Sequence, residues 1–109
     1  MENFGQYIRR LRTEKGYTLT ELGAMLKIDS AGLSKIETGH KKMKQEKLPI
    51  LAEIFELNLE KLKELFYGEE IALKLYENNC STSTLIVAEE RVKYMKLCSA
   101  KQGSLNFNS

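Results

Sequence analysis

The stretch from Thr18 to Gly39 contains start and stop signals for two short helices, and this feature restricts the fold most. Thr18 and Glu21 have the spacing of a capping box, which predicts a helix over 19–26. After a turn of three residues, Asp29 can cap another helix, and Gly39 supplies the left-handed residue that ends it. The sequence therefore predicts two short helices joined by a tight turn.

The rest of the chain is also predicted to be helical, because it has one Pro and few alternating β-branched runs. Further helices are expected over 4–15, over 45–56, from Leu59 onward and over 83–100. The expected N-caps are Asn3, Asn58, and either Thr82 or Ser83. Gly68 either ends the fifth helix or lies inside a longer one that reaches Tyr76, and the sequence leaves both open. The small and polar residues of 102–109 predict a disordered tail.

Positive charge is concentrated in one part of the chain, which has 109 residues and a net charge of +2. Residues 9–47 hold ten Lys or Arg against five Asp or Glu, a local net charge of +5. Residues 58–109 hold seven of each. A basic segment in a small domain is typical of proteins that bind polyanions.

Several classes of protein are disfavoured by the composition. The longest apolar run of the second half, 85–88, is far shorter than the roughly 20 residues of a membrane span, and the N-terminus has no secretion signal. We therefore expect a cytoplasmic protein whose two cysteines, Cys80 and Cys98, are free thiols. One histidine, no nucleophile pair and no glycine-rich phosphate loop argue against an enzyme, a metal site or a cofactor.

The spacing of many residues carries a resemblance to a known family. The pattern is Arg12-x3-Gly16-x-Thr18-x3-Leu22-Gly23-x2-Leu26-x-Ile28-x4-Leu33-Ser34-x-Ile36-Glu37-x-Gly39. It closely resembles the helix-turn-helix of the Cro/repressor (XRE) family of bacterial and phage regulators, over residues 8–57. The resemblance implies an all-α fold, with a five-helix lambda-repressor-like DNA-binding domain at 1–67. A C-terminal helical extension at 68–101 would then serve dimerisation or partner binding.

The resemblance implies that the third helix enters the major groove of DNA. By position, the residues expected to contact bases are Ser30, Ala31 and Lys35. Their neighbours, expected to contact bases or backbone, are Asp29, Gly32 and Ser34. The residues expected to contact phosphates are Thr18, Thr20, Thr38, His40, Lys41 and Lys42. Leu19 departs from the family, which commonly has a phosphate-binding Gln at this position.

Other matching residues are expected to support the fold rather than to contact DNA. Gly23, where the family usually has Ala, is expected to be small because the third helix crosses close to it. Arg12 and Glu37 occupy positions where the family often has a partly buried ion pair.

The C-terminal part offers a further resemblance and an apolar seam. Residues 65–71 and 87–94 look like the C-terminal helices of a subgroup of regulators found beside DNA methyltransferases in restriction-modification systems. The seam consists of Leu85, Ala88, Val92 and Met95, at 3, 4, 3 spacing, and it either forms a dimer interface or packs on the fifth helix of its own chain.

The function expected from these features is that of a transcription regulator. A homodimer would bind a near-palindromic double-stranded DNA site and repress, or activate by touching polymerase. The alternatives are an antitoxin or a protein-interaction module that binds a partner protein through its C-terminal helices.

Overall fold

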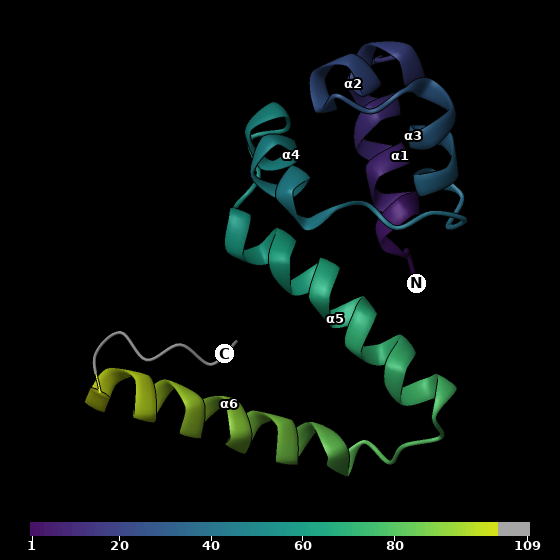
Figure 1. Ribbon diagram of the computed structural model, residues 1–109. Helices are drawn as coiled ribbons and strands as arrows, with labels where there is room; N and C mark the ends of the chain where they lie inside the picture. Colours follow the sequence, from purple (N-terminus) through teal and green to yellow (C-terminus); the bar gives the residue numbers. More distant parts are fainter. Residues whose placement is uncertain (103–109) are drawn as a thin grey trace. The chain divides into compact units, whose positions relative to one another are not determined.

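The computed structural model describes residues 1–102, and every regular element in that range is helical (Figure 1). The elements are α1 (Phe4–Glu14), α2 (Leu19–Leu26), α3 (Ser30–Glu37), the 3-10 turn η1 (Gln45–Lys47), α4 (Leu48–Ile54), α5 (Leu59–Glu77) and α6 (Ser83–Gln102). The chain divides into two units, of which the first is Met1–Glu70 and the second begins at Ile71. None of the helices within residues 1–102 has both the length and the apolar character to cross a membrane.

Most helix starts follow from local side-chain capping, as the sequence predicts. Asn3 and Thr18 each form a complete capping box, with Gln6 and Glu21 as their partners. Asn58 accepts a hydrogen bond from the backbone N–H of residue 61 at 3.0 Å. At the start of α6, Ser81 Oγ accepts the backbone N–H of Ser83 at 3.2 Å.

Two expected boundaries differ from the structure, and one that the sequence left open is decided. The fourth helix splits into η1 and α4 and ends at Ile54, because Glu56 adopts a left-handed conformation with φ of 53°. Gly68 lies inside α5, which continues to Glu77. Gln102, expected in the disordered tail, belongs to α6, and residues 103–109 lie outside the described range.

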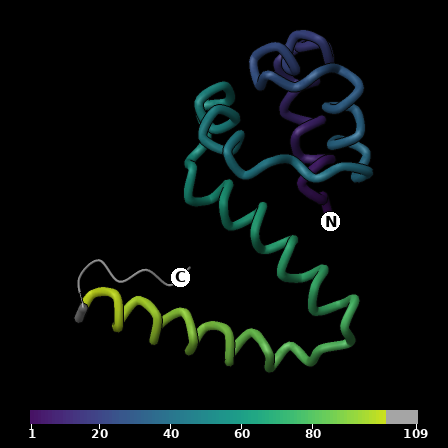
Figure 2. Tube along the Cα trace, viewed as in Figure 1, coloured from purple at the N-terminus to yellow at the C-terminus, as the bar shows by residue number. Residues whose placement is uncertain are grey.

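The hydrophobic core of the first unit collects one apolar face from each of its helices. Figure 2 traces the path of the chain through α1, the α2–α3 turn and the long connection to α4. Six side chains are buried almost completely: Ile8, Leu22, Leu26, Leu33, Leu51 and Leu62. The turn between α2 and α3 is therefore fixed by packing on both sides.

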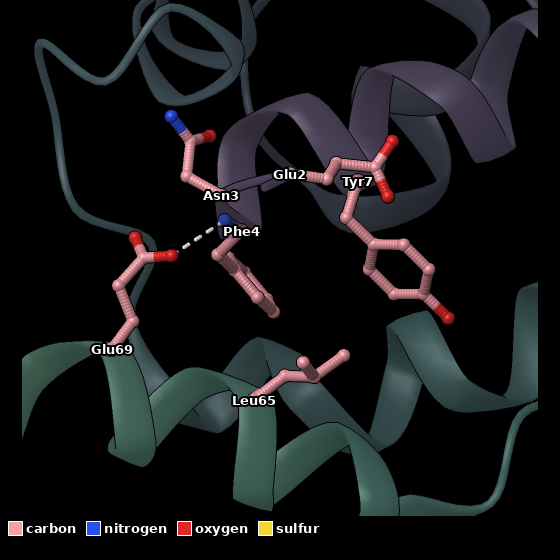
Figure 3. A pocket seen from close by; sticks show the side chains of 6 residues that line it. All are labelled: Glu2, Asn3, Phe4, Tyr7, Leu65 and Glu69. Carbon is pink, nitrogen blue, oxygen red and sulfur yellow. Dashed lines mark hydrogen bonds between the residues drawn. The ribbon is translucent and has the colours of Figure 1, made fainter.

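The first part of α5 is attached to the N-terminus of α1. The backbone N–H of Phe4 donates to Glu69 Oε2 at 2.8 Å, and the Phe4 and Phe66 rings meet edge to face at 5.2 Å between centroids. Figure 3 shows Glu69 directed at this N–H, in a pocket that Leu65 and Tyr7 also line. A carboxylate is favourable there because the helix dipole places partial positive charge at the N-terminus of α1.

Two glycines in helices differ in what surrounds them, and this gives a stability prediction. A Cβ on Gly5 would lie 2.4 Å from the carbonyl oxygen of Ile36 and 2.8 Å from that of Glu37, whereas a Cβ on Gly68 would meet nothing within 4 Å. Gly5→Ala is expected to lower the free energy of unfolding by roughly 1–3 kcal/mol, because α1 must move away from α3. Gly68→Ala is expected to raise it by about 1 kcal/mol through helix propensity.

Urea unfolding of the wild type and both variants at one protein concentration measures these changes. A Gly5→Ala variant as stable as the wild type would show that α1 and α3 are not in close contact.

Candidate nucleic-acid interface

The turn between α2 and α3 is closed by the backbone. Lys27 takes a left-handed conformation with φ of 58°, and the N–H of Ile28 donates to the carbonyl of Gly23 at 2.8 Å. Ile28 is half-buried and packs against the core. Asp29 Oδ1 then accepts the N–H of Gly32 at 2.7 Å and starts α3. The N-terminal end of α3 is thus set by two hydrogen bonds and by the packing of Ile28.

Gly23 is required for a different reason from the one expected. The atom that a Cβ on Gly23 would approach first is the carbonyl oxygen of Ile28, at 2.5 Å, and not an atom of α3. The small residue therefore leaves room for the turn to fold back on α2.

The residues expected to contact bases lie on the exposed side of α3. Ser30, Ala31 and Lys35 are exposed, and Ser34 is half-buried. Ala31 and Lys35 are four residues apart and therefore share one face of the helix. The structure thus brings together a small apolar group and an ammonium on the accessible face of α3.

Two of the neighbouring residues have internal roles instead. Gly32 is buried, so it does not belong to the accessible face. The Asp29 side chain is exposed, but one of its carboxylate oxygens is occupied by the capping bond to Gly32. The Lys41 ammonium lies beside them, 3.6 Å from where a Cβ on Gly32 would be.

Gly39 turns the chain at the end of α3, so that the basic loop after it folds back on the last turn of the helix. Gly39 has φ of 83°, and the N–H groups of His40 and Lys41 both donate to the carbonyl of Lys35. His40 Nδ1 lies 2.9 Å from the hydroxyl of Thr38, which is also close to the carbonyl oxygen of Ser34. The loop therefore holds its polar side chains close to the last turn of α3.

Lys42 is engaged within the protein, which sequence analysis did not foresee. Its ammonium forms an ion pair with Glu70 of α5 and lies 5.5 Å from the centre of the Phe66 ring. A phosphate contact by Lys42 would compete with Glu70 for the positive charge. No local signal predicts this pair, because the two residues are 28 positions apart.

The start of α2 carries two threonine hydroxyl groups, those of Thr18 and Thr20. The N–H of Thr18 donates to Glu21 Oε1, and Thr18 Oγ1 accepts the N–H of Glu21. The hydroxyl proton of Thr18 is left over for an external acceptor, and Thr20 is exposed. Leu19 is half-buried and packs on the core, so this position contributes no polar group.

Arg12 and Glu37 form an ion pair between α1 and the end of α3. Arg12 Nε and Nη2 donate to the two carboxylate oxygens at 2.7 and 3.0 Å, and Nη1 donates to the carbonyl of Tyr17 at 3.0 Å. The two side chains are 13% and 3% exposed. The hydrogen bond to Glu37 raises the pKa of Arg12 above its ordinary value. The guanidinium of Arg12 therefore stays charged, and its hydrogen bonds fix α3 against α1.

Removal of one partner should cost more stability than removal of both. Glu37→Ala leaves the Arg12 guanidinium nearly buried without its anion, and we expect the free energy of unfolding to fall by about 3 kcal/mol. The double variant Arg12→Met with Glu37→Leu should be at least about 1 kcal/mol more stable than Glu37→Ala. Thermal and urea unfolding test this order, and a single variant that melts with the wild type would contradict it.

The C-terminal seam is exposed in the second unit. α6 has no buried side chain among residues 83–100. Its large apolar side chains, counting the seam and others, are between 45% and 65% exposed: Leu85, Ile86, Val87, Val92, Tyr94, Met95 and Leu97. Four of these, Ile86, Val87, Tyr94 and Leu97, lie outside the seam.

A small pocket lies at the N-terminus of α1. A pocket of about 50 Å³ lies between Glu2, Asn3, Phe4, Tyr7, Leu65 and Glu69, compared with roughly 300–1,000 Å³ for ligand sites. Within residues 1–102, no three His, Cys, Asp or Glu side chains are placed to hold a metal ion.

Comparison with known proteins finds helix-turn-helix relatives. A family described as "Helix-turn-helix" matches residues 8–62. The HTH-type transcriptional repressor RghR of Bacillus subtilis (strain 168) is 34% identical in an alignment of 84 residues that covers 73% of this chain and 62% of that protein. The chain therefore spans less than two thirds of the length of this relative.

Solved structures with similar folds include two regulators. The clp gene regulator ClgR from Corynebacterium glutamicum is 25% identical with a TM-score of 0.49, over 69% of this chain and 79% of that one. A SinR–SinI protein complex contains a chain that is 22% identical with a TM-score of 0.46, over 84% of this chain and 96% of that one.

Proposed function

Because the chain belongs to this helix-turn-helix family, we propose that it is a DNA-binding transcription regulator which recognises a near-palindromic site as a homodimer. The observation that carries the proposal is the exposed face of α3, where Ala31 and Lys35 lie together on a helix whose opposite face is buried. Lys35 can donate to guanine O6 and N7, and Ala31 can touch a thymine methyl. Ser30 is exposed at the first residue of α3 and can bond to a base or a phosphate.

The phosphate contacts that we propose come from ammonium and hydroxyl groups around α3. Lys41 is placed beside the first turn of α3, and Thr18 has a free hydroxyl proton at the start of α2. Three further exposed residues can contribute. Thr20 lies in the first turn of α2, and Thr38 and His40 follow the end of α3. Lys42 would join them after giving up Glu70. Such contacts give affinity that is independent of base sequence.

Repression by occupying a promoter is the regulatory outcome that we propose, and the relative RghR is named as a repressor. The likeness of 65–71 and 87–94 to regulators of restriction-modification systems remains a prediction. Selection of bound duplexes from random sequences would test both predictions. The selected sequences are compared with the DNA around the protein's own gene.

The decisive experiment is a measurement of DNA binding against salt concentration. A protein that binds DNA through several ammonium groups loses affinity linearly on a logarithmic salt scale. A selected duplex and a random duplex are compared at each salt concentration. Equal affinity for both duplexes, or no salt dependence, would contradict a sequence-specific DNA-binding function.

Two lysines should separate base contacts from phosphate contacts. Lys35→Ala is expected to weaken the preference at one base pair by about 1–3 kcal/mol. Lys41→Ala should weaken binding to all sequences alike and reduce the salt slope by about one. Lys42→Ala should act in the same way but less strongly, because wild-type Lys42 must first leave Glu70.

Fluorescence anisotropy on selected and random duplexes measures these effects. If Lys35→Ala reduced binding to both duplexes equally, Lys35 would be a phosphate contact and base recognition would have to lie elsewhere on α3.

We infer that the C-terminal helical extension, residues 68–101, forms the dimer interface, and this gives another prediction. Val92→Asp would place a charge in the seam and is expected to raise the dimer dissociation constant at least roughly 30-fold, or about 2 kcal/mol. Ile86→Asp is the matched control, because Ile86 lies outside the seam on the same helix and is similarly exposed. Sedimentation at micromolar concentration compares the two variants with the wild type.

A variant Val92→Asp that stays dimeric, or a wild type that is monomeric, would remove the seam from the dimer interface. The apolar surface of α6 would then favour the second candidate function, capture of a partner protein by the C-terminal helices, as an antitoxin or an interaction module would do.

A further inference from the structure

The chain that leaves α3 is attached to α5 at two points. The Lys42 ammonium forms an ion pair with Glu70, and the Tyr67 hydroxyl donates to Gln45 Oε1 at 2.6 Å. Between these two points Met43 is buried in the core. All of these residues belong to the first unit, so the attachment does not depend on the second.

Glu70 contributes a charge to this attachment, while other contacts set the position of Lys42. The N–H groups of the two residues before Lys42 donate to the carbonyl of Lys35, and Met43 directly after it is buried. The ammonium also lies 5.5 Å from the centre of the buried Phe66 ring. Loss of the carboxylate charge should therefore free the ammonium without moving the loop.

The Glu70 carboxylate binds Lys42 in the way that a phosphate group would. Carboxylate and phosphate oxygens both accept charge-assisted hydrogen bonds from an ammonium. Lys42 directly follows Lys41, whose ammonium lies beside the first turn of α3, and consecutive Cα atoms are about 3.8 Å apart. A DNA backbone that contacts Lys41 would therefore pass close to Lys42, where it would meet Glu70 as a competing anion.

The Lys42–Glu70 pair is weak enough for DNA to displace. Its two side chains are 59% and 46% exposed, and ion pairs at such exposure add little to stability because water and salt screen them. A DNA phosphate attracts the ammonium more strongly, because its neutralisation releases counterions condensed on the duplex. Displacement of Glu70 then subtracts part of the gain from one phosphate contact, whatever the base sequence.

We propose that Glu70 is an internal counterion that lowers the affinity of the basic loop for the DNA backbone. This inference rests on the proposed DNA-binding function and concerns the regulation of that same surface. In the free protein the carboxylate holds the Lys42 ammonium, and on DNA binding a phosphate takes its place. α5 thereby limits the part of the affinity that does not depend on base sequence.

Glu70→Gln tests the proposal, because it removes the charge but keeps the size of the side chain and an oxygen acceptor. Affinity for selected and random duplexes is expected to rise alike, at least roughly threefold at 50 mM salt. One more phosphate contact adds about 0.9 to the salt slope, so the gain should shrink roughly threefold between 50 and 200 mM salt. Fluorescence anisotropy measures both quantities.

Two further variants separate this contact from a general effect of net charge. Glu64→Gln removes the same charge from α5, but Glu64 pairs with Lys61 of its own helix at 3.9 Å, so little change in affinity is expected. In a Lys42→Ala background, Glu70→Gln should no longer raise the affinity. An equal gain from Glu64→Gln, or an undiminished gain in the Lys42→Ala background, would overturn the proposal.

The remaining outcomes distinguish this inference from the function on which it rests. If Glu70→Gln lowers the affinity, Glu70 positions Lys42 for DNA and the internal counterion is wrong. If the wild type binds DNA and Glu70→Gln binds equally well, the internal counterion alone is overturned. If neither protein binds any duplex, the DNA-binding function is overturned, and the inference falls with it.

Discussion

The Arg12–Glu37 ion pair joins the three helices on which the interface depends. Arg12 comes from α1, Glu37 from the last turn of α3, and the third hydrogen bond of the guanidinium goes to the carbonyl of Tyr17 just before α2. Gly5 lets α1 approach the same end of α3 closely. A nearly buried ion pair stabilises a fold only when its geometry is good, because each buried charge needs hydrogen bonds to offset the loss of water. The C-terminal end of α3 is therefore fixed, while its N-terminal turn remains accessible.

The N-terminal ends of α2 and α3 are poor sites for a phosphate group. A helix N-terminus attracts anions, but the starts of α2 and α3 already have carboxylates from Glu21 and Asp29 hydrogen-bonded to them. A phosphate would meet like charge at either place. Affinity for a phosphate backbone must therefore come from side chains, and the Lys41 ammonium beside the first turn of α3 is the best placed of them. The basic excess of residues 9–47 thus serves as the source of the attraction, and the helix ends mainly set positions.

Local chemistry explains which parts of the structure could be predicted from the sequence. The N-cap at Asn3, the capping box at Thr18 and the left-handed Gly39 depend on residues within one turn of each other, and they were predicted correctly. The neighbour of Gly23 and the Lys42–Glu70 pair depend on how the backbone folds back, which no spacing rule encodes. Gly68 was undecided for the same reason, since its fate depends on the stability of the whole of α5. The exposed residues expected to contact DNA stay predictions, because an exposed side chain can contact DNA but need not do so.

The second unit raises a question of stability that the first does not. An isolated helix of about 20 residues is marginal in water, and most helices in proteins gain their stability from packing. α6 buries no side chain within residues 83–100, so little besides its own backbone hydrogen bonds stabilises it in a single copy. If a second copy covers the seam, folding of α6 and association become one equilibrium, and the stability of the helix then depends on protein concentration. DNA binding by two linked α3 helices would depend on concentration in the same way, because only the paired form can reach two half-sites at once.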